Sequence, residues 1–82
     1  MTSIDKLFDR LSGNPHGANF SELRKLLIEQ DFSLDRITGS HHIFKRGPLI
    51  IVIPVHNKRV KAVYVRRVVE LIKNENKERK II

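Results

Sequence analysis

Two adjacent histidines, His41 and His42, are the side chains of this sequence best suited to acid–base chemistry. They follow Gly39–Ser40 and lead into the basic pair Lys45–Arg46. An imidazole ordinarily titrates at about pH 6.5, so it can accept or release a proton near neutral pH. Because successive side chains on a strand point to opposite faces, only one of the two rings can face a given ligand. The other ring is expected to pack or to support it.

The residues alone leave the role of His41 open. A hairpin histidine bonded to a neighbouring backbone group is the commoner case, and the sequence by itself favours it over catalysis. His42 is expected to turn away from His41, together with Phe44, toward packing. His56 lies just beyond the third predicted strand, where it could approach His41 as a second proton-transfer group or simply be exposed. A zinc site is not expected, because the chain has no cysteine and no helical spacing of histidines.

The charge of the chain favours a polyanionic partner. Its 82 residues carry 16 Lys and Arg against 9 Asp and Glu, a net charge of +7. Each basic residue taken singly fits a solvated surface charge, and only clustering on one face would make a phosphate site. Gly39 is assigned to the turn itself, whatever the function. The candidate RNA-binding residues are Ser40, Lys45, Arg46, Lys58, Arg59 and Lys61.

Length and composition limit the size of the domain, its cross-links and its expected location. The chain is long enough for one small domain with a single core. Without cysteine it forms no disulfide. The first residues lack the apolar run of a signal peptide, and the longest apolar run, Leu49–Val55, is too short to span a bilayer. We therefore expect a cytoplasmic protein.

Three segments read as helices. Apolar residues recur at helical spacing over Ile4–Leu11, and a turn-rich linker follows at 12–17. Asn19 and Glu22 have the spacing of a capping box, which predicts a helix from Phe20 to about Gln30. Val60–Ile72 also reads as a helix, although its valines favour strand slightly. Asn74–Lys80 is expected to be a charged tail.

Three segments read as strands: 32–37, 41–46 and 49–53. A glycine turn at Thr38–Gly39 is expected to join the first two, and Gly47–Pro48 the next two. The third strand is apolar on both faces, as is usual for a strand buried in a parallel sheet. The short connections nevertheless require an antiparallel sheet, because a parallel pair needs a longer crossover. Either the N-terminal helix or a partner chain must therefore cover its second face.

The sequence thus predicts an α+β fold. A three-stranded antiparallel sheet carries helices on one face in the order α-β-β-β-α, the architecture of a double-stranded RNA-binding domain, after an N-terminal helical extension. The expected division is an extension and linker at 1–18, the domain at 19–73 and the tail at 74–82.

Three stretches closely resemble the HicA toxins of type II toxin–antitoxin pairs. They are Asn19–Leu23, Arg36–Phe44 with its Gly-Ser-His tripeptide, and Lys58–Val68. The resemblance spans roughly Asn19 to Ile72. It implies a double-stranded RNA-binding-like fold, an mRNA-cleaving endoribonuclease and a cognate HicB-like antitoxin. It also implies that the catalytic histidine is the one directly after Gly-Ser, here His41.

The implied chemistry suits the residues present. His41 would act as general base or acid while a 2′-hydroxyl attacks the adjacent phosphate, with lysines and arginines stabilising the charge and no metal or other cofactor required. Two alternatives remain: a non-catalytic RNA-binding domain that uses the same basic face, and a protein-interaction module with incidental charge. Aromatic stacking of RNA is not expected, because every phenylalanine fits a core position.

Overall fold

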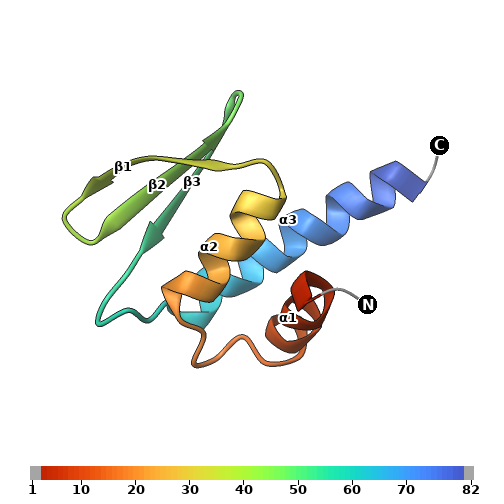
Figure 1. The fold of residues 1–82 in the computed structure, drawn as a ribbon, viewed down its shortest axis with the longest axis horizontal. Coiled ribbons are helices and arrows are strands. Elements are labelled where there is room, and N and C mark those ends of the chain that lie inside the picture. Colours follow the sequence, from red (N-terminus) through yellow and green to blue (C-terminus); the bar gives the residue numbers. More distant parts are fainter. Residues whose placement is uncertain (1–2, 81–82) are drawn as a thin grey trace.

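The computed structural model describes the backbone of residues 3–80 and the side chains of residues 3–75. The sheet is antiparallel with strand order β1-β2-β3, and α2 and α3 lie against one of its faces (Figure 1). This is the predicted α+β, double-stranded RNA-binding-domain-like fold with an N-terminal helix, so the fold prediction is confirmed. The elements are α1 (Ser3–Gly13), α2 (Phe20–Glu29), β1 (Ser33–Thr38), β2 (His41–Arg46), β3 (Leu49–Pro54) and α3 (Ala62–Lys80).

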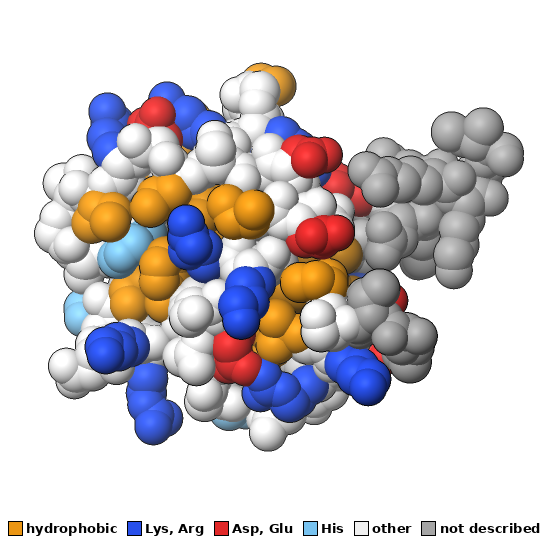
Figure 2. All heavy atoms as spheres, in the orientation of Figure 1, with side chains coloured by type: hydrophobic (Ala, Val, Ile, Leu, Met, Phe, Trp, Pro, Cys, Tyr) orange, Lys and Arg blue, Asp and Glu red, His pale blue; other side chains and the backbone are white. Residues whose placement is uncertain are grey.

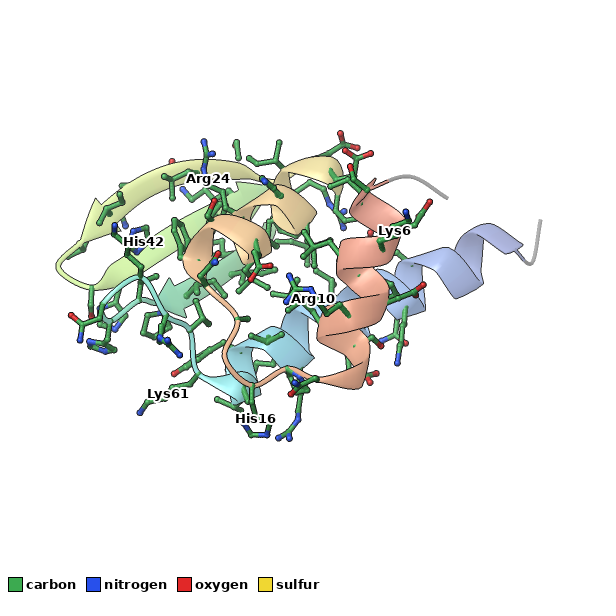
Figure 3. All side chains as sticks on the ribbon, turned by 60° about the horizontal axis from the view of Figure 1, so that its bottom comes forward. Lys6, Arg10, His16, Arg24, His42 and Lys61 are labelled. Carbon is green, nitrogen blue, oxygen red and sulfur yellow. The ribbon has the colours of Figure 1, made fainter. Side chains whose placement is uncertain are left out.

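Helix α2 begins with the predicted capping box. The backbone N–H of Glu22 donates to Oδ1 of Asn19 at 2.9 Å, and the backbone N–H of Asn19 donates to Oε1 of Glu22 at 3.3 Å. Two N–H groups that the helix leaves unpaired are satisfied in this way. Glu22 also forms an ion pair with Arg10 of α1, and Figure 3 shows Arg10 on the side of α1 that faces α2. One glutamate therefore caps α2 and ties α1 to it.

The core lies between the helices and the sheet, and α1 extends it by packing on α2 and α3 (Figure 1). The helical periodicity of the sequence predicted the buried positions of the helices, because these residues lie on the apolar stripe of their own helix. The largest fully buried side chains are Leu11, Leu23, Leu26, Leu27, Phe44, Ile53, Val65 and Val68.

Leu11 is the residue through which α1 is anchored, since its side chain is only 1% exposed. We expect Leu11→Ala to lower the free energy of unfolding by about 2–5 kcal/mol, because the truncation leaves a cavity in the core. Val63→Ala is the matched control, because Val63 is an aliphatic side chain of α3 that is 46% exposed. Urea denaturation measures both. If the free energy of unfolding fell equally in the two variants, α1 would not be part of the core.

The sheet is covered on one face only. Strand β2 pairs with both neighbours, and Phe44 of β2 and Ile53 of β3 are buried on the helix-facing side of the sheet. Ile50 and Val52 of β3 point to the opposite side and are 59% and 41% exposed. The second apolar face of β3 is thus left open, and α1, which packs on α2 and α3, is not its cover.

Two local predictions need correction. The residues between β1 and β2 are Gly39–Ser40, one position later than the predicted Thr38–Gly39. Helix α3 continues to Lys80 through the segment for which the sequence predicted a charged tail. The continuation fits the composition of 74–80, because glutamate, lysine and arginine are good helix formers.

Candidate functional site

The two histidines lie on opposite faces of β2. His42 pairs with Ile53 and shares the helix-facing side with Phe44. The His42 ring packs on Phe20, with ring centroids 4.3 Å apart and planes tilted by 50°, and Figure 3 shows it pointing from the strand toward the start of α2. His41 is exposed on the open face, opposite Thr38 and Pro54. His41 is therefore the ring that a ligand on the open face meets.

The turn before the histidines is held by backbone contacts. Gly39 has φ +60°, a conformation that costs glycine little and other residues more. The carbonyl of Ser40 accepts from the backbone N–H of Val55 at 2.8 Å and lies 3.2 Å from Nδ1 of His42. Because a carbonyl oxygen only accepts, Nδ1 of His42 carries the proton in this contact. The Nε2 atom of His42 is then the nitrogen left for other partners.

The chain after β3 brings basic residues to the same end of the sheet. His56 and Arg59 exchange backbone hydrogen bonds of 3.0 and 2.9 Å around Asn57 and Lys58, whose φ angles are +50° and +64°. These values identify a type I′ turn. The backbone N–H of Phe20 donates to the Lys58 carbonyl at 2.8 Å, so the turn is fixed against the start of α2.

Three lysine and arginine side chains from this segment, Lys58, Arg59 and Lys61, are exposed. Within residues 3–75, none of them forms an ion pair with a described carboxylate. Lys61 extends outward just before α3 (Figure 3). His56 is exposed on the same turn, and the structure gives its side chain no contact with His41 among these residues. The end of the sheet at His41 is therefore cationic and open to solvent.

A hollow of about 360 Å³ lies on the helix-facing side of this end. In Figure 2 a histidine side chain lies among hydrophobic side chains on this face, with lysines and arginines around them. The sequence pattern did not reveal the hollow: Phe20 packs against the core as predicted, but its ring is only half-buried and also lines the hollow. The one available signal was the position of Phe20 directly after the N-cap, at the surface end of a helix. The lining residues are Asn19, Phe20, Ser21, His42, Val55 and Lys58.

Arg46 has structural partners instead of a place at this site. It forms a two-pronged ion pair with Glu75 of α3, donates to the Gln30 carbonyl at 2.8 Å and lies 4.6 Å from the centre of the Phe32 ring. It is also five residues along β2 from His41, about 16 Å at roughly 3.3 Å per residue. The structure therefore gives Arg46 structural partners and does not bring it to the end of the sheet at His41, and its predicted part in RNA binding stays a prediction.

Lys45 is on the same open face as His41, but it is partly neutralised. Its Nζ atom lies 3.5 Å from Oδ2 of Asp35, a residue of β1. Lys45 is four positions along β2 from His41, about 13 Å at roughly 3.3 Å per residue. The structure therefore does not bring Lys45 next to His41, although a strand of RNA laid along the open face could reach both.

A structural role for Arg46 predicts a stability effect without a binding effect. Arg46→Met should lower the free energy of unfolding by about 1–3 kcal/mol, because it leaves the Gln30 carbonyl and the Glu75 carboxylate without their partner. For the RNA binding that the sequence leads us to expect, the folded variant should have the same affinity as wild type. Denaturation measures the free energy of unfolding, and a binding titration on the same sample measures the RNA affinity. A variant with unchanged stability and weakened RNA binding would restore Arg46 to the site.

A second groove runs along the outer edge of β3, beside α3. It has a volume of about 310 Å³ and is mostly apolar, with Arg67 over the Tyr64 ring at 5.6 Å from its centre. It adjoins the exposed Ile50 and Val52. Because Ile50 and Val52 both line this groove and lie on the open face, the groove meets the apolar part of the open face at the edge of β3.

The described residues contain neither a metal site nor a membrane-spanning helix. No group of three or more His, Cys, Asp or Glu side chains within 3–75 is arranged to hold a metal ion. No helix in the described part of the chain is long and apolar enough to cross a membrane.

The fold and this end of the sheet define a class of protein. A three-stranded antiparallel sheet backed by two helices, with an exposed histidine and exposed lysines and an arginine at one end, is a small α+β domain of the double-stranded RNA-binding type. Fold alone does not assign an activity.

The particular family follows from a sequence comparison. Residues 20–74 match the family model described as HicA toxin of bacterial toxin-antitoxin. The chain therefore belongs to the HicA toxin family, which makes it the toxin of a toxin–antitoxin system and implies an antitoxin partner. No curated protein and no solved structure matched the chain.

Proposed function

We propose that this HicA toxin is an endoribonuclease that cleaves mRNA, with His41 as its catalytic residue. The observation that carries the proposal is an exposed imidazole at the end of the sheet to which the segment 56–61 brings three cations that have no carboxylate partner within residues 3–75. An imidazole in solvent contact can reach a ribose, and nearby cations can stabilise the charge that develops on a phosphate. The cations are Lys58, Arg59 and Lys61.

The proposed step uses the 2′-hydroxyl of RNA as nucleophile. Nε2 or Nδ1 of His41 takes the 2′-hydroxyl proton as the oxygen attacks the adjacent phosphorus, and the bond from phosphorus to the 5′-oxygen of the next nucleotide breaks. The leaving oxygen takes a proton from the returning imidazolium, from His56 or from water. The products are a 2′,3′-cyclic phosphate and a free 5′-hydroxyl. Ser40 is proposed to donate to the phosphate from the turn.

The product ends test this chemistry. Purified wild-type protein should cleave RNA in the presence of EDTA and leave 2′,3′-cyclic phosphate ends, because base-promoted attack by the 2′-oxygen needs no metal ion. Mass spectrometry of the fragments identifies the ends. Cleavage that stops in EDTA, or fragments with a 5′-phosphate, would contradict the proposed reaction.

A non-catalytic RNA-binding domain is the second candidate function. The double-stranded RNA-binding-type fold and the same three cations favour it. It differs in one respect: RNA binding by cations does not require the His41 imidazole. A His41→Ala variant that keeps full biological activity would support this alternative over the nuclease.

We further propose that a HicB-like antitoxin covers the open sheet face and His41 together and so blocks the substrate. The support is the apolar surface that the fold leaves uncovered, in which Ile50 and Val52 lie on the same face as His41. Burying such a surface favours association by roughly 25 cal/mol per Å² of apolar area. The imidazole of His41 should therefore lose solvent accessibility in the complex, as diethyl pyrocarbonate labelling would measure. Equal labelling of His41 in free and bound toxin would exclude occlusion.

A further inference from the structure

We propose that the hollow between α2 and β2 binds one nucleobase of the RNA strand, next to the nucleotide that His41 attacks. The inference rests on the proposed function for its ligand, RNA, but it concerns a different surface and different residues. The hollow has a volume of about 360 Å³, at the lower end of the range of roughly 300–1,000 Å³ for small-molecule sites. That size suits a single base better than an extended peptide.

The walls of the hollow match the faces of a base. A nucleobase has two apolar π faces, which stack on aromatic side chains. The half-exposed ring of Phe20 provides such a surface, and Val55 adds an aliphatic one. The Phe20 ring contacts His42 and Phe44 in tilted arrangements, at 4.3 and 6.0 Å between ring centroids, so the base would stack on the part of the ring that these contacts leave exposed.

The polar groups at the hollow match the edge of a base. Oδ1 of Asn19 is used by the helix cap, which leaves its Nδ2 group as a donor. Nδ1 of His42 is held at the Ser40 carbonyl, which leaves Nε2 as an acceptor. The hydroxyl of Ser21 can do either. Donors and an acceptor beside an aromatic ring are what the hydrogen-bonding edge of a base requires.

The position of the hollow links it to the proposed catalytic residue. His42 lines the hollow and His41 is its neighbour on the other face of β2, so only the narrow Gly39–Ser40 turn separates the two sides. Lys58 is at the rim and has no described carboxylate partner in residues 3–75, so it can pair with the phosphate of the bound nucleotide. An RNA strand that passes around the turn would thus place a base in the hollow and the next phosphate near His41.

The experiment measures base stacking without cleavage. Short RNA oligonucleotides carrying 2-aminopurine at one position are titrated with the His41→Ala protein. We expect the fluorescence of 2-aminopurine to be quenched on binding, and Phe20→Leu in the same background to remove most of the quenching. The affinity should fall by about 5-fold to 150-fold, the equivalent of one lost base–aromatic stack. Tyr64→Leu is the matched control, because Tyr64 lines the groove at β3 instead.

Two further measurements keep the test decisive if Phe20→Leu folds poorly. An RNA with an abasic nucleotide at the quenched position should bind the Phe20-containing protein about 5-fold or more weakly. Lys58→Gln should reduce the slope of log affinity against log salt by about 0.7, the value for one phosphate of a single strand. Unchanged affinity for the abasic RNA, or quenching that survives Phe20→Leu, would overturn the base site.

The outcomes separate this inference from the nuclease. If wild-type protein cleaves RNA but binding and quenching do not depend on Phe20, the base site is wrong and the nuclease stands. If wild-type protein does not cleave RNA but Phe20-dependent quenching is seen, the nuclease is wrong and the base site stands. If the hollow instead binds only the antitoxin, Phe20→Leu will weaken antitoxin binding while leaving RNA titrations unchanged, which also overturns the base site.

Discussion

Purified His41→Ala protein should cleave RNA about 100-fold to 10,000-fold more slowly than wild type, the usual contribution of a positioned general acid or base. The imidazole is exposed on the open sheet face and forms no packing contact in the core, so the substitution removes chemistry without removing structure. Initial rates on a fluorescent RNA oligonucleotide measure the loss. The melting temperature of the variant should stay within a few degrees of wild type.

Alanine variants of two other histidines serve as comparisons for the cleavage rate of His41→Ala. His16 lies in the exposed linker before α2, so His16→Ala should cleave at the wild-type rate. His56→Ala should show an intermediate loss if His56 supplies the proton to the leaving oxygen, and none if water does. A His41→Ala rate equal to that of His16→Ala would remove His41 from the mechanism.

Toxin carrying both Ile50→Lys and Val52→Lys should remain active but escape its antitoxin. These side chains are 59% and 41% exposed on the open face, so lysine is tolerated in the free protein but would be buried without a partner in the complex. A buried charge without a partner costs about 3 kcal/mol or more, so the dissociation constant should rise by about 100-fold or more. Isothermal titration with the cognate antitoxin measures it.

The control for this variant is Val63→Lys. Val63 is 46% exposed and Val52 is 41% exposed, but Val63 belongs to α3. The Val63→Lys variant should therefore bind the antitoxin as wild type does. If the double variant is still neutralised in cells and binds with unchanged affinity, the antitoxin does not cover the open face.

Local sequence signals accounted for most of the fold. The Asn19–Glu22 spacing marked the start of α2, and the capping hydrogen bonds are present. Strict alternation along β2 placed Phe44 in the core and His41 on the opposite side. These predictions worked because each depends on residues within one turn of helix or one strand, where the geometry follows from the backbone period alone.

The remaining features depend on contacts between residues distant in the sequence. Arg46 read as a phosphate-binding residue beside Lys45, but the fold brings Glu75 to it from 29 positions away. The hollow needs Phe20 against His42, from two different elements. No pattern within a single element encodes such pairings.

The length of α3 was underestimated for a different, local reason. Charge density indicated a tail, whereas the intrinsic helix preference of glutamate, lysine and arginine favoured continuation.

The central claim is that this HicA toxin acts through the imidazole of His41, and its most direct test is made in cells. Wild-type protein and His41→Ala are expressed separately without antitoxin, at matched protein levels, while growth and the integrity of several mRNAs are followed. We predict that wild-type protein arrests growth and fragments mRNA, and that His41→Ala does neither. Growth arrest with fragmented mRNA in cells expressing His41→Ala would contradict the account.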